Sequence, residues 1–66
     1  MIKTEDILSI ATEKMFEDFK VKKLRENAYK IVGYRYGKEE IKLVGYAYEV
    51  AHFINTYYGY TEKDLI

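Results

Sequence analysis

The side chains best suited to catalysis or metal binding are His52 and Glu49, which share one face if their segment is helical. A histidine beside a carboxylate can act as a base with its orienting acid, or the two can bind a metal ion. Both roles need further convergent groups, and no third ligand or nucleophile is evident beside this pair. The pattern therefore favours a solvated surface pair, and the sequence predicts no catalytic residues, metal site or cofactor.

Other candidate groups are also isolated. Glu39 and Glu40 are adjacent in the chain, so their carboxylates should diverge into water rather than share a proton. The hydroxyl groups lack an obvious base, and the glycines do not form a phosphate-binding loop: these are Ser9, Thr12, Thr56, Gly33, Gly37 and Gly45. A chain this short has little room for a pocket of substrate size. We therefore expect a non-enzymatic protein without a small-molecule substrate.

Length and composition predict one small globular domain over residues 1–66. A core of this size supplies only about 3–5 kcal/mol of stability. The chain has no cysteine, so neither disulfides nor a cysteine zinc site can support the fold. Its start lacks a basic segment followed by an apolar one, and no apolar stretch is long enough to span a bilayer. We expect a cytoplasmic protein without a membrane segment.

Two amphipathic helices are predicted. The first should begin with Thr4 as its N-cap and end near Asp18, with an apolar face of Ile7, Leu8, Ala11, Met15 and Phe19. The second should begin near Gly45 and end at Gly59, with an apolar face of Ala47, Val50, Ala51, Ile54, Tyr57 and Tyr58. Its opposite face, which should be exposed to solvent, carries Tyr48, Glu49, His52, Asn55 and Thr56. The last residues, Leu65 and Ile66, should fold back onto the body or fray.

The residues between these helices favour strands. Residues 29–36 are rich in β-branched and aromatic side chains, and turn-forming residues 25–27 and 37–39 flank them. The predicted fold class is therefore α+β: a helix, a three-stranded antiparallel sheet and a helix. An all-α three-helix bundle is the alternative. It is supported by a nearly continuous helical stripe of Ile41, Val44, Ala47, Ala51, Ile54 and Tyr58.

Strand alternation then predicts which side chains share each face of the sheet. If Leu24 pairs with Tyr29 and Tyr36 pairs with Ile41, the core face carries Phe19, Val21, Val32, Tyr34, Ile41 and Leu43. The opposite face is the predicted partner-binding surface: Lys20, Lys22, Tyr29, Ile31, Arg35, Lys42, Val44 and Tyr46. Eight of the 66 residues are tyrosine, a residue type that suits contact surfaces.

The net charge of zero conceals an asymmetry. Residues 19–42 hold eight basic and three acidic residues, a net +5, and the two flanks together carry −5. A molecule with a basic sheet and acidic helices orients charged partners even though it attracts none by net charge. Neutral total charge argues against tight non-specific binding to nucleic acid, because the acidic flanks repel phosphates.

Three interpretations of the predicted surface remain open. It can be an ordinary solvated face, a contact site for another protein or a second copy, or a nucleic-acid site. In the last case its lysines would contact phosphates while Tyr29 and Tyr46 stack on bases. We favour a protein-binding regulator or inhibitor of the kind that phages and mobile elements carry. A nucleic-acid-binding protein using the same face is the alternative.

The predicted order and length are similar to those of double-stranded-RNA-binding domains. Members of that family bind phosphate through a lysine cluster at the start of their second helix. Here the corresponding segment is Gly45-Tyr46-Ala47-Tyr48-Glu49 and contains no lysine. The similarity is one of architecture and transfers no functional residue to this chain.

Overall fold

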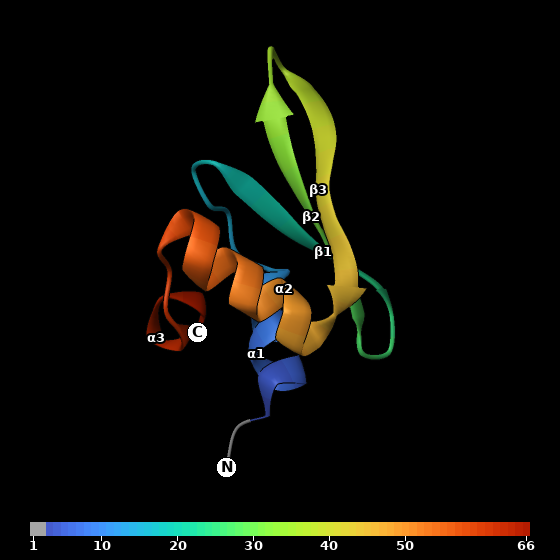
Figure 1. Ribbon diagram of the computed structural model, residues 1–66, viewed down its shortest axis with the longest axis vertical. Coiled ribbons are helices and arrows are strands. Elements are labelled where there is room, and N and C mark those ends of the chain that lie inside the picture. Colours follow the sequence, from blue (N-terminus) through green and yellow to red (C-terminus); the bar gives the residue numbers. More distant parts are fainter. Residues whose placement is uncertain (1–2) are drawn as a thin grey trace.

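The computed structural model describes residues 3–66, which form a three-stranded antiparallel sheet with helices packed together on one side (Figure 1). The elements run α1 (Thr4–Ala11), β1 (Phe19–Arg25), β2 (Ala28–Arg35), β3 (Lys38–Tyr46), α2 (Ala47–Phe53), a π-helical turn η1 (Ile54–Tyr58) and α3 (Glu62–Leu65). The predicted α+β class is confirmed. The three-helix alternative is wrong, because the segment from Phe19 to Tyr46 pairs as strands.

The strands follow one another across the sheet in the order β1-β2-β3. Tight turns at residues 26–27 and 36–37 join them. Strand β3 carries a β-bulge at Lys42, because Val32 pairs with Ile41 whereas the preceding Ile31 pairs with Leu43. The β2–β3 hairpin extends beyond the helices at the top of Figure 1, and the molecule is 39 Å long as a result.

The observed register inverts the predicted faces of β2. Tyr29 pairs with Lys23 rather than with Leu24, and a slip of one residue moves every side chain of a strand to the other face. Tyr29 and Ile31 therefore lie in the core, whereas Val32 and Tyr34, predicted to face the helices, lie on the opposite side.

The bulge at Lys42 also separates two residues that were expected to share the core face. Leu43 packs against the core as predicted, but Ile41 lies on the other side and is exposed. An extra residue in a strand changes the alternation beyond it, so residues 41 and 43 no longer point the same way.

Tyr29 is the largest fully buried side chain among the residues described. Its phenol lies 2.9 Å from the Ser9 hydroxyl and donates a hydrogen bond of 3.3 Å to the carbonyl of Glu5. The ring thus links β2 to α1 while its hydroxyl stays satisfied. The rest of the main core comprises Ile7, Leu8, Ala11, Phe19, Val21, Ile31, Ala47, Val50, Ile54 and Leu65.

Helix α1 is shorter than predicted, since it ends at Ala11 and residues 12–18 are irregular. Met15, expected on the core face, is 96% exposed. The chain leaves the helix so that the Phe16 ring can stack on Phe19 at 4.5 Å, with Phe19 already in β1. The N-cap is Lys3 rather than Thr4, and the Asp6 carboxylate accepts a hydrogen bond from the Lys3 backbone N–H.

The second helix agrees with the sequence prediction except at Tyr57, which was expected on the apolar face and is exposed. The second helix ends at Gly59, whose φ of 80° is a left-handed conformation that glycine adopts at little cost. The predicted solvent face, including His52, is exposed throughout. Leu65 folds back and is buried. The N-cap of α3 is Thr61, and hydrogen bonds from its backbone N–H and hydroxyl lower the pKa of Asp64 within the helix.

The β2–β3 turn contains a strained residue. Tyr36 has a φ of 53° and is 92% exposed, so it occupies the left-handed region with little packing in return. We expect Tyr36→Asn to stabilise the fold by about 0.5–1 kcal/mol, because Asn-Gly suits this type of turn. Urea denaturation measures the change. Tyr36→Val, which tolerates a positive φ poorly, should destabilise; equal stability of both variants would contradict this account of the strain.

Candidate protein interface on the outer sheet face

The sheet face turned away from the helices, here called the outer sheet face, combines apolar and basic side chains. Pairing places Lys20 beside Val32, Lys22 beside Lys30, and Lys30 beside Val44 on this side. The face comprises Lys20, Lys22, Leu24, Lys30, Val32, Tyr34, Glu39, Ile41, Val44 and Tyr46. All three strands contribute to it, so the sheet fixes the positions of these side chains.

The apolar members of this face are only partly covered. Val32 is 1% exposed although it lies outside the main core, because its neighbours on the face enclose it. The larger side chains remain about half exposed: Leu24, Tyr34, Ile41, Val44 and Tyr46. Leu24, Val44 and Tyr46 line a hollow of about 270 Å³ at the β3–α2 end. Several exposed apolar side chains gathered on one face are typical of a contact site.

The charged members form a lysine-rich group around a single carboxylate. Lys22 Nζ lies 2.8 Å from Glu39 Oε1. This hydrogen bond lowers the pKa of Glu39, and the charges of Lys30 and Lys20 act in the same direction. The same bond raises the pKa of Lys22. Three lysines thus lie near one glutamate, and the face is positive although the whole chain is neutral.

Four of the eight residues assigned to this face from the sequence do lie on it: Lys20, Lys22, Val44 and Tyr46. Tyr29 and Ile31 were wrongly placed there, because they are buried in the core. Their assignment failed through the one-residue difference in register.

Arg35 and Lys42 were also wrongly placed on this face. Lys42 lies on the helix side of the sheet. Gly33 pairs with the buried Phe19, so a Cβ on Gly33 would point to the helix side, and it would lie 2.9 Å from Lys42 Cε. Its Nζ pairs with Glu40 at 3.3 Å. Arg35 lies at the hairpin end with its guanidinium 5.6 Å from the centre of the Tyr36 ring.

Sequence reasoning missed several members of the outer face, notably Lys30, Tyr34 and Ile41. The turns alone do not give the observed phase, because a two-residue turn at Glu26-Asn27 pairs Arg25 with Ala28 and would then pair Leu24 with Tyr29, as predicted. The observed phase comes from a register shift in β1 between Lys23 and Arg25, which pairs Lys23 with Tyr29. No pattern in the sequence indicated this shift or the bulge at Lys42.

The His52 ring is exposed, and its hydrogen-bonding neighbour is the Thr56 hydroxyl at 3.5 Å. Across residues 3–66, no three His, Cys, Asp or Glu side chains are grouped so that they could hold a metal ion. None of the helices in this range combines the length and apolar character needed to cross a membrane.

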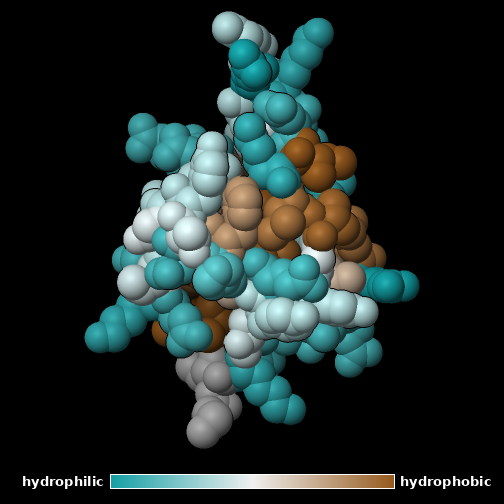
Figure 2. All heavy atoms as spheres, viewed as in Figure 1, coloured by the Kyte–Doolittle hydropathy of each residue, from teal (hydrophilic) through white to brown (hydrophobic). Residues whose placement is uncertain are grey.

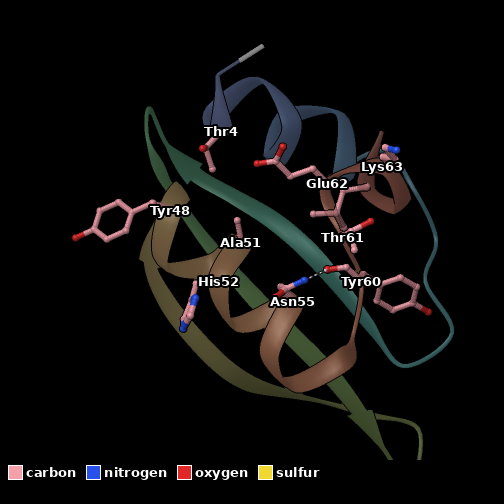
Figure 3. A pocket seen from close by; sticks show the side chains of 10 residues that line it. Thr4, Tyr48, Ala51, His52, Asn55, Tyr60, Thr61, Glu62 and Lys63 are labelled. Atoms are coloured by element: carbon pink, nitrogen blue, oxygen red, sulfur yellow. Dashed lines mark hydrogen bonds between the residues drawn. The ribbon is translucent and has the colours of Figure 1, made fainter. Parts of the chain in front are cut away.

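A hollow of about 640 Å³ lies between α2 and the C-terminal segment. Its polar side chains spread apart instead of converging on one point, and Tyr48 and His52 turn away from Glu62 (Figure 3). One hydrogen bond joins its two walls, from the Asn55 amide to the Tyr60 carbonyl at 3.1 Å. The hollow is a seam between packed segments without a catalytic arrangement.

Comparisons of the chain with protein-family models, with curated proteins and with solved structures found no match.

Proposed function

We propose that this protein is a small regulator or inhibitor that acts by covering a surface of a partner protein, without a catalytic step, through the outer sheet face. The observation that carries the proposal is the group of half-exposed apolar side chains bordered by lysines on one rigid face. Interfaces commonly combine an apolar centre with a polar rim. Tyr34 and Tyr46 are of a residue type enriched among the contacts that contribute most to binding.

The chemistry of this face indicates the partner. Lys20 and Lys30 have no ion-pair partner among residues 3–66, since the only pairs there are Lys22–Glu39 and Lys42–Glu40. A partner surface with an apolar centre and carboxylates around it complements such a face. A second copy docked face to face would oppose lysines with lysines, which disfavours it. We expect light scattering to give the mass of a monomer.

A substitution at Val44 tests the proposal. Val44 is 54% exposed and pairs with Lys30, so Val44→Glu can form a cross-strand ion pair and should leave the fold intact. The new carboxylate would repel an acidic partner at the centre of the apolar group. We expect capture of the partner from an extract of the producing cells to fall by roughly tenfold or more.

Met15→Glu is the matched control, because Met15 is an exposed apolar residue in the irregular segment before β1, outside the outer sheet face. It should leave capture unchanged. Quantitative mass spectrometry of the captured proteins compares the two variants with the parent. Equal capture by the Val44→Glu variant and the parent, with both folded by circular dichroism, would remove the outer sheet face from consideration.

Nucleic acid is the second candidate, because Lys20, Lys22 and Lys30 lie on the same face as Tyr34 and Tyr46. Some sheet surfaces bind single-stranded nucleic acid through lysines that contact phosphates and tyrosines that stack on bases. Lys22 is already paired with Glu39, and the chain is neutral overall, so we rank this function lower. Oligonucleotide binding that weakens steeply from low to physiological salt would support it.

A further inference from the structure

A second surface on this molecule, next to the outer sheet face, is the free edge of β3. Strand β3 pairs only with β2. A two-residue turn joins β2 to β3, and both of its residues, Tyr36 and Gly37, have positive φ. Arg35 and Lys38 are the paired residues on either side of this turn. In such a hairpin the closing pair is hydrogen-bonded and the pattern then alternates. Glu39 and Ile41 consequently direct their backbone N–H and C=O groups away from β2.

A groove runs beside this edge on the helix side. It has a volume of about 600 Å³ and is lined by Leu43 of β3 together with Tyr48, Glu49, His52, Phe53, Thr56 and Tyr57. Figure 2 shows hydrophobic atoms gathered along β3 and beside α2, below the hydrophilic hairpin end. The apolar floor of the groove is therefore adjacent to a strand edge with unpaired backbone groups.

The π-helical turn shapes one end of the groove. The Tyr57 ring, within η1, stacks on Phe53 with centroids 5.1 Å apart and planes within 9°. Tyr57 is exposed, so the stack presents an open aromatic surface. Short π-helical segments are frequent at functional sites, and this one widens the helix where the groove lies.

The charge of the groove comes from Glu49. Its carboxylate lies against the end of β3, with Oε2 3.2 Å from the position of a Cβ on Gly45. Glu49 has no ion-pair partner among residues 3–66, whereas Glu40 on the same side is paired with Lys42. A ligand in this groove therefore meets the Glu49 carboxylate beside apolar rings.

We propose that the β3 edge and this groove bind an extended peptide segment that adds a fourth strand to the sheet, with an apolar side chain on Phe53 and Tyr57 and a basic side chain at Glu49. Extended backbone supplies donors and acceptors at the spacing of the free edge, and pockets for alternate side chains give specificity. The charge of Glu49 selects a basic segment, in contrast to the acidic partner that suits the outer sheet face.

The probe is a displayed library of random linear peptides ten residues long, selected against the folded protein. The selected sequences should carry a basic residue two positions from an apolar one, because residues at that spacing share a face of a strand. On binding, NMR should show slower amide exchange at Glu39 and Ile41. Tyr57→Ser should weaken binding by roughly tenfold, and Glu49→Gln should weaken it and reduce its salt dependence.

Backbone N-methylation of one selected peptide provides the sharpest comparison. Alternate N–H groups of a bound strand point to opposite sides. Methylating one alternate set of residues removes the N–H groups that face β3, and methylating the other set removes only the N–H groups that face solvent. One peptide should lose binding and the other keep it. Failure to select any peptide, equal binding of both methylated forms, or amide changes centred on Lys20 and Lys30 would overturn the proposal. Lys20 lies on β1, at the opposite edge of the sheet from β3, so Lys20→Glu should weaken capture through the outer sheet face and leave peptide binding unchanged.

Discussion

Replacing Tyr29 by alanine should unfold the protein. The Tyr29 ring is 0% exposed and is the largest fully buried side chain among the residues described. Truncating a buried aromatic ring costs about 3–5 kcal/mol, and the whole core of a domain this small supplies only about 3–5 kcal/mol. We expect Tyr29→Ala to lose its circular dichroism signal and its dispersed NMR spectrum at 25 °C without denaturant.

Tyr29→Phe separates the ring from its hydroxyl. The phenylalanine keeps the ring but removes the hydrogen-bonding partner of Ser9 and of the Glu5 carbonyl. We expect a folded protein destabilised by about 1–2 kcal/mol in urea titrations. A folded Tyr29→Ala variant would contradict the observed register. It would instead agree with the face predicted from the sequence, on which Tyr29 is a surface residue whose removal leaves the fold intact.

Phe19→Ala should have the second-largest effect, because Phe19 is the centre of an aromatic cluster drawn from three parts of the chain. Its ring stacks on Phe16 at 4.5 Å and on Tyr58 at 4.3 Å, and meets Tyr60 edge-on at 5.6 Å. The variant loses a fully buried ring and these aromatic pairs, so we expect a cost of about 3–5 kcal/mol. That cost is comparable to the whole stability of a domain this small, so circular dichroism without denaturant should show the variant largely unfolded.

Phe16→Ala is the matched control for Phe19. Phe16 is half-buried and stacks on one side of the same cluster. Its loss should cost about 1–2 kcal/mol, because less apolar area leaves water and Phe19 keeps its contact with Tyr58. Equal destabilisation by the two variants would show that Phe19 is not the centre of the cluster.

The sequence by itself determined the elements that depend on neighbours along the chain. Apolar residues at helical spacing and Gly59 located the second helix and its end, and they left His52 on the exposed side. Dense β-branched and aromatic residues located the strands. These signals are local, because backbone conformation and amphipathic period both act over a few residues.

The tertiary structure alone decided which side chains share a face. Strand β1 has a register shift between Lys23 and Arg25, and β3 bulges at Lys42. The first feature turns Tyr29 and Ile31 inward and Tyr34 outward, and the second separates Ile41 from Leu43. Side chains alternate between the two faces of a strand, so a shift of one residue in the pairing moves every side chain to the opposite face. The sequence pattern along the strand is the same in both cases.

What selects the observed phase is long-range packing. The buried phenol of Tyr29 forms hydrogen bonds with Ser9 and the Glu5 carbonyl on α1. The Phe19 ring packs against Tyr58 and Tyr60 from the other end of the chain. These contacts join residues that are distant in sequence, and burial of their rings favours one register over the other. The lysine-rich outer sheet face and the β3 groove follow from that choice.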